Sequence, residues 1–128
     1  MTLPETCREF DLVLVVLYGS RATGHARPDS DVGVIRRSGL IPPELFLELL
    51  GKLEVATGLK DIDLVDLRRA PPLLKHSVGT HGRALYEDEP GRFNLFKVYA
   101  WKLWLDDQQT LRKLDAVYIR EGLERLKA

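Results

Sequence analysis

Several features that restrict where a protein can work are scarce in this chain of 128 residues. It has one cysteine, Cys7, so no internal disulfide can form, and the chain suits a reducing cytoplasm. Its longest apolar run, Leu12 to Tyr18, is far shorter than the roughly 20 residues that a bilayer-spanning helix needs. We therefore expect a cytoplasmic protein that does not enter a membrane.

An excess of charge of one sign is also missing. Lys+Arg and Asp+Glu both number 19, so the formal net charge is zero. A protein that binds DNA, RNA or anionic lipid through its overall charge needs an excess of basic residues. We expect no direct binding to nucleic acid. The three histidines have no spacing that is typical of zinc ligands.

What is present is enough apolar sequence, 45% of the residues, for one globular domain. Apolar periodicity and turn residues predict a small mixed α/β (α+β) sheet flanked by helices, with a C-terminal helical extension. The expected strands cover residues 12–17, 31–37, 62–67 and 83–87, and the expected helices cover 2–10, 43–57, 73–78 and about 92–126. Asp106 and Asp107 mark an expected break in the last of these helices.

The most informative segment runs from Tyr18 to Val34. A strand ends there in Gly19-Ser20, and about ten residues later Asp31 opens the next strand. Glycine lets backbone N–H groups approach phosphate oxygens, and a helix that starts after it directs its positive end at them. Acids on the neighbouring strand are suited to Mg²⁺. The pattern therefore favours a site for a phosphate chain and a metal.

Each part of this pattern has a simpler interpretation when it is taken alone. Gly19-Ser20 would be a turn in which the serine caps a helix. Asp61, Asp63 and Asp66 would belong to the solvated face of a strand. The ordered combination, with its spacing, is what favours the functional interpretation.

The chain resembles the nucleotidyltransferase superfamily of DNA polymerase beta, and within it the minimal nucleotidyltransferases, small proteins often encoded beside a HEPN protein. The resemblance rests on Gly19-Ser20-Arg21-Ala22, on Ala26-Arg27-Pro28-Asp29-Ser30-Asp31, and on Asp61-Ile62-Asp63-Leu64-Val65-Asp66-Leu67. It implies one nucleotidyltransferase-like domain over residues 1–128, with a core at about 1–90 and C-terminal helices at about 91–128.

The resemblance also implies roles for particular residues. Gly19 and Ser20 would bind the terminal phosphates of ATP, and Arg21 would reach a phosphate unless it is simply an exposed helix arginine. Asp31 would be the first metal ligand, and Asp63 the third carboxylate, which helps the acceptor hydroxyl to lose its proton. The family uses two Mg²⁺ ions for in-line displacement at the α-phosphorus, with pyrophosphate as leaving group.

Gly33 departs from the family pattern, Asp-x-Asp, which has its second metal ligand at this position. Residues two apart on a strand share a face, so glycine here removes a ligand from the face of Asp31. Mg²⁺ needs about six oxygens, and we expect weaker metal binding. Asp61, on the face expected for Asp63, and Asp29 are acids that could partly compensate. Because glycine weakens a strand, it indicates a lost function rather than a structural need.

Aromatic residues are concentrated near the start of the C-terminal helical region. Core packing is the default role for Phe96, Trp101 and Trp104, but the number of aromatics in this region is generous for so small a domain. One face is therefore expected to bury a partner. By resemblance, that partner is a HEPN-domain protein.

Two functions follow. In the first, the chain is an enzyme that transfers AMP from ATP to a protein hydroxyl and acts as the antitoxin of a HEPN toxin, with a metal site weakened at Gly33. In the alternative, it is a catalytically degenerate nucleotide-binding module that neutralises its HEPN partner by contact. A homo-oligomer is left open by the sequence.

Overall fold

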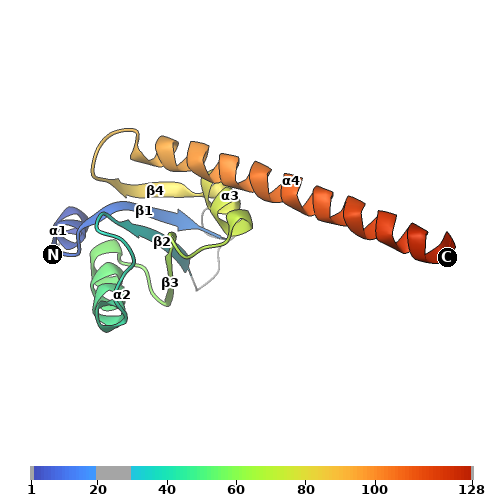
Figure 1. Ribbon diagram of the computed structural model, residues 1–128. Coiled ribbons are helices and arrows are strands. Elements are labelled where there is room, and N and C mark those ends of the chain that lie inside the picture. The colour runs from blue at the N-terminus through green and yellow to red at the C-terminus, as the bar shows by residue number, and fades with distance from the viewer. Residues whose placement is uncertain (1, 20–29, 128) are drawn as a thin grey trace.

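The computed structural model describes residues 2–19 and 30–127, which form a four-stranded mixed sheet with helices on both faces (Figure 1). In chain order the elements are α1 (Leu3–Glu9), β1 (Leu12–Tyr18), β2 (Ser30–Arg36), α2 (Pro43–Thr57), β3 (Ile62–Asp66), α3 (Pro72–His81), β4 (Arg83–Glu87) and α4 (Arg92–Lys127). The expected fold class is confirmed. The predictions for Ser20, Arg21 and Asp29 lie outside the described residues.

The strand order β3-β2-β1-β4 brings the functional segments together. β1 is antiparallel to β2 and to β4, whereas β2 and β3 are parallel. Every residue of β1 is buried, as its continuous apolar run predicted. Because of these strand directions, the end of β1 and the beginnings of β2 and β3 meet at the same end of the sheet.

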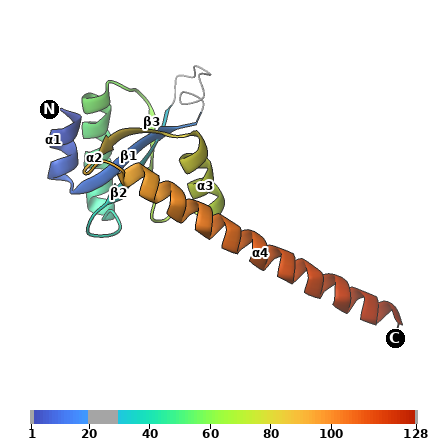
Figure 2. The ribbon, with the colours of Figure 1, turned by 90° about the horizontal axis from the view of Figure 1, so that it is seen from above.

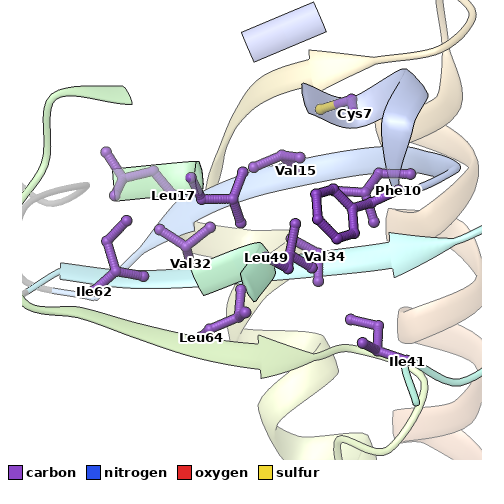
Figure 3. Packing of buried hydrophobic residues seen from close by; sticks show 12 residues of the cluster. Cys7, Phe10, Val15, Leu17, Val32, Val34, Ile41, Leu49, Ile62 and Leu64 are labelled. Atoms are coloured by element: carbon purple, nitrogen blue, oxygen red, sulfur yellow. The ribbon is translucent and has the colours of Figure 1, made fainter. Parts of the chain in front are cut away.

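One face of the sheet is covered by α1 and α2, and we call the buried cluster there the α2-side core. Figure 3 shows Val32 and Val34 of β2 close to Leu49 of α2 in this layer. The members are Cys7, Phe10, Leu12, Val15, Leu17, Val32, Val34, Ile41, Leu49, Leu53, Ile62 and Leu64. Removing these apolar side chains from water is the main stabilising contribution of the face.

The opposite face is covered by α3 and by the first part of α4. Its buried cluster, the α3-side core, consists of Val13, Leu14, Val16, Tyr18, Leu67, Val78, Phe93, Phe96 and Ala100. Alternation along β1 explains the division, since neighbouring residues such as Val15 and Val16 point to opposite faces.

Helix termini follow the signals in the sequence. The Thr2 hydroxyl accepts a hydrogen bond from the Glu5 N–H, which caps α1. Gly58 has a left-handed φ of 73° and ends α2, where its N–H donates to the Glu54 carbonyl. Both residues are of types that favour these positions. α3 continues past its predicted end at Val78 as far as His81.

The predicted break in the C-terminal helix is wrong, because α4 is continuous from Arg92 to Lys127. Aspartate lowers helix propensity by only some tenths of a kcal/mol, and neither Pro nor Gly occurs from 92 to 121. At a rise of 1.5 Å per residue the helix is about 54 Å long. Its far half projects well beyond the sheet (Figures 1 and 2). Among the described residues, no helix has a stretch that is both long and apolar enough to span a membrane.

Candidate functional site

The two carboxylates that the sequence singled out lie side by side. Asp31, near the start of β2, is the register partner of Asp63, near the start of β3. On the other side, Asp31 lies opposite Tyr18, the last residue of β1. Asp31 is half-buried and Asp63 is exposed. The structure therefore brings together Asp31 and Asp63, as the sequence predicted, at the end of the sheet where β1 stops.

Gly19 follows β1 and has to be glycine for two reasons. Its φ of 84° lies in the left-handed region, which side chains disfavour. In addition, a Cβ on Gly19 would collide with the carboxylate of Asp31. The backbone of this turn can therefore come close to Asp31 only because the side chain is missing. That close approach is the arrangement expected of a backbone that binds phosphate beside an acidic site.

Tyr18 reports the electrostatic character of the site. Burial raises the pKa of its phenol to about 12, and the negative charges of Asp31 and Asp63 add to that increase. The phenol consequently stays protonated at physiological pH and is a hydrogen-bond donor. The two carboxylates give this end of the sheet a negative charge that a cation would have to balance before a phosphate chain could approach.

A cleft of about 320 Å³ opens at this point. Its lining residues are Tyr18, Gly19, Asp31, Leu74, Ser77 and His81. The last three belong to α3, so the helix forms the wall that faces the end of β1. Ser77 and His81 were not predicted to belong to the site from the sequence. Their spacing with Leu74 places them on one face of a helix, but nothing in the sequence shows that this face covers the end of β1.

Gly33 is explained by its packing. It is buried, and a Cβ there would lie 2.7, 2.8 and 2.9 Å from three carbon atoms of the Leu67 side chain. Leu67 is completely buried in the α3-side core. The absence of a side chain at 33 thus has a structural role, contrary to the expectation that this glycine marks only a lost function.

Among the residues that the structure describes, the other acids near the site do not replace the missing carboxylate. Asp61 lies outside β3 with a left-handed φ of 53°, so strand alternation does not place it on the face of Asp63 as expected. Asp66 is buried and accepts hydrogen bonds from the backbone N–H groups of Ile41 (2.9 Å) and Arg68 (3.1 Å). Its carboxylate therefore holds two loops in place rather than belonging to a solvated face.

These residues fit only part of a metal site with two ions. Asp31 and Asp63 offer carboxylate oxygens, the ligands that Mg²⁺ prefers. Position 33 offers none, and Leu67 occupies the space beside it. Within residues 2–19 and 30–127, no group of three or more His, Cys, Asp or Glu side chains is placed to hold a metal ion. The arrangement suits one divalent cation better than two.

The aromatic residues of α4 divide into three environments. Phe96 is 6% exposed and belongs to the α3-side core, so it is a packing residue, and the predicted contact with a partner is wrong for it. Trp104 stacks on His76 of α3, with ring centroids 4.3 Å apart. Trp101 is 54% exposed. Of the residues predicted to contact a partner, Trp101 is the most accessible.

The fold that brings these residues together has relatives among known proteins. The family model described as polymerase beta, nucleotidyltransferase matches residues 2–90. The chain therefore belongs to this family, and the match ends just before α4. No match was found among curated proteins.

Solved structures extend the likeness into α4. A chain of a toxin–antitoxin complex with AMP-PNP is 28% identical, with a TM-score of 0.66 over 94% of this chain and 95% of that one. A chain of the complex between the tri-AMPylated Shewanella oneidensis HEPN toxin and MNT antitoxin is 27% identical. Its TM-score is 0.62, and the match covers 94% of this chain and 92% of that one. A chain of the toxin–antitoxin MntA-HepT is 26% identical, with a TM-score of 0.61 over 94% and 93%. The expected resemblance to MNT antitoxins is confirmed.

Proposed function

We propose that this chain is the antitoxin of a HEPN toxin and that it transfers AMP from ATP to a hydroxyl of that toxin in the cytoplasm. The observation that carries the proposal is the pairing of Asp31 with Asp63 beside the Gly19 turn. The similarity to chains of toxin–antitoxin complexes, one of them with AMP-PNP and another with an AMPylated toxin, supports it.

The chemistry assigns a role to each described residue of the site. The backbone of the Gly19 turn binds the phosphate chain of ATP. Asp63, the more exposed carboxylate, accepts the proton of the acceptor hydroxyl. A bond then forms between the acceptor oxygen and the α-phosphorus, the bond from that phosphorus to the oxygen of the β-phosphate breaks, and pyrophosphate leaves. A divalent cation held by Asp31 and Asp63 would offset negative charge on the phosphates.

The surface of α4 supports a protein acceptor. Apolar side chains remain exposed along both halves of the helix, among them Leu95, Val98, Tyr99, Trp101, Leu111, Leu114 and Val117. In proteins most of the stability of a helix comes from packing of its apolar face rather than from helix propensity. Exposed apolar residues in such numbers indicate a surface that a partner covers. This surface would bind the toxin and hold its hydroxyl at the cleft.

The test is transfer of AMP to a purified HEPN-domain toxin, with intact-protein mass spectrometry as readout. The native chain should add adenylate to that protein in the presence of ATP and Mg²⁺. Asp31→Asn and Asp63→Asn should each lower the rate at least a hundredfold, about the contribution of a catalytic base. Glu44→Gln, which changes an exposed carboxylate of α2 on the other face of the sheet, is the matched control. Unchanged transfer by both site variants would exclude the proposed site.

A second function, neutralisation of the toxin by contact, is favoured by the packing of Leu67 over Gly33. If it holds, Asp31→Asn and Asp63→Asn should still suppress the toxin, measured as growth of cells that express it. Trp101→Ala should reduce suppression, whereas Val55→Ala, which truncates a 75% exposed residue on α2, should not. Loss of suppression in the two aspartate variants, with toxin binding retained, would decide for AMP transfer.

A further inference from the structure

The cleft beside Asp31 has a second wall that neither the family pattern nor the sequence assigned. Leu74, Ser77 and His81 of α3 line it opposite Gly19 and Asp31. Within the part of the chain that the structure describes, the side chains of Ser77 and His81 make no hydrogen bond or ion pair. Two polar side chains without partners therefore border a cleft whose other wall contains a carboxylate.

The position of this wall is fixed by close packing of α3 against β1 on one side and against α4 on another. At its C-terminus, a Cβ on Gly82 would lie 2.6 Å from Cγ1 of Val16 and would collide with the carbonyl oxygen of Val78. The helix can therefore end against β1 only because residue 82 is glycine. His81, the last helical residue, is held by this contact next to the end of β1.

Contacts with α4 hold the other side of α3. His76 stacks on Trp104 at 4.3 Å, and a Cβ on Gly79 would lie 3.6 Å from the Lys97 Cα, so the two helix backbones run close together. Of the two histidines of α3, His76 is thus engaged in packing and His81 lines the cleft. A rigid helix is a better support for ligand contacts than a loop, because its side chains keep their positions.

We propose that Ser77 and His81 bind the phosphate chain of the nucleotide from the α3 side of the cleft. The inference rests on the proposed function, since it concerns the same nucleotide. Asp31 and Asp63 repel phosphate, so an anion in this cleft needs donors on the opposite wall. The Ser77 hydroxyl and an imidazole N–H of His81 are such donors, and both are suited to phosphate oxygens.

The experiment is calorimetric titration of AMP-PNP, and separately of AMP, into the native chain and its variants at fixed Mg²⁺. His81→Ala should raise the Kd for AMP-PNP about tenfold, the usual effect of losing a hydrogen bond to a charged group. Ser77→Ala should have a smaller effect in the same direction. The Kd for AMP should change less than that for AMP-PNP, because AMP lacks the outer phosphates.

Matched variants separate binding from structure. Thr80→Ala changes an exposed residue of the same helix, whose hydroxyl donates to the His76 carbonyl, and it should leave the Kd unchanged. His81→Gln keeps an N–H donor and should recover part of the affinity. Thermal unfolding without nucleotide should be the same for His81→Ala and the native chain, which a purely structural role for His81 would not allow.

Each outcome decides the proposal. AMP-PNP binding that is weakened by Asp31→Asn but not by His81→Ala would overturn the role of the α3 wall and leave the proposed function standing. No AMP-PNP binding by the native chain would overturn both. An equal loss of affinity in His81→Ala and Thr80→Ala would also overturn the proposal, since it would reflect a general change in α3.

Discussion

The two faces of the sheet are built from the same strands but have different contents. On β2, Val32 and Val34 point into the α2-side core and are completely buried. Asp31 and Gly33 alternate with them and face α3, where one lines a cleft and the other lies under Leu67. One face is thus a continuous apolar layer, and the other combines a core with a polar site. A shift of one residue in the register would exchange them, so the packing of the first face fixes the geometry of the second.

The largest effect on stability is expected from the apolar face. Leu49→Ala removes a completely buried side chain and should lower the free energy of unfolding by about 2–5 kcal/mol. Leu47→Ala makes the same change two residues away on α2, at a side chain that is 76% exposed, and should alter it by less than about 0.5 kcal/mol. Urea unfolding followed by circular dichroism measures both. A similar loss in the two variants would mean that the α2-side core is packed differently.

A smaller effect is expected at Gly33, on the face that carries the site. Gly33→Ala places a methyl group against Leu67 and should cost about 1–3 kcal/mol, less if Leu67 turns into the adjoining cavity of about 460 Å³ that it also lines. Gly51→Ala is the control, because a Cβ there meets nothing within 4 Å, and it should stabilise α2 by about 0.5–1 kcal/mol.

The pairing of position 33 with Leu67 can be measured by a double-mutant cycle. If the methyl group and Leu67 compete for one space, Gly33→Ala should cost less in a Leu67→Ala background than in the native chain. Leu67 should also limit metal binding by an aspartate placed at position 33. Mn²⁺ affinity, measured by electron paramagnetic resonance, should rise more in Gly33→Asp/Leu67→Ala than in Gly33→Asp. Additive stabilities would show that Leu67 does not restrict position 33.

The smallest effect is a loss of stability in alkali, to which one residue of each core contributes. Burial raises the pKa of the Cys7 thiol from 9.0 to about 12 and that of Tyr18 from 10.0 to about 12. Above pH 9 the unfolded chain loses these protons before the folded chain does, so the free energy of unfolding falls as pH rises. For Cys7 the loss should be about 1 kcal/mol by about pH 10.

Variants assign this alkaline loss to its two sources. Cys7→Ser should flatten the decline between about pH 9 and pH 10, and Tyr18→Phe should flatten it above about pH 10, each measured by urea unfolding across the pH range. The control is the native chain near neutral pH. Both groups are protonated there in the folded and in the unfolded chain, so they should give the free energy of unfolding no dependence on pH. An unchanged slope in Cys7→Ser would contradict the burial of its thiol.

Much of the fold and the centre of the site could be predicted from local patterns. The apolar run of β1 and the caps at Thr2 and Gly58 follow from periodicity and turn chemistry, whereas the grouping of Asp31 with Asp63 follows from the family resemblance. These signals are contained within a few residues of the chain, and a family motif then relates the two acidic strands. Such information does not depend on knowing which surfaces meet.

The sequence by itself thus determined the elements, the class of fold and the order of Gly19, Asp31 and Asp63. Only the tertiary structure decided that Leu67 packs over Gly33, that Phe96 is buried while Trp101 is exposed, and that His81 borders the cleft. The physical reason is that side-chain contacts between distant segments depend on helix positions and close packing over the whole domain, which no local pattern encodes.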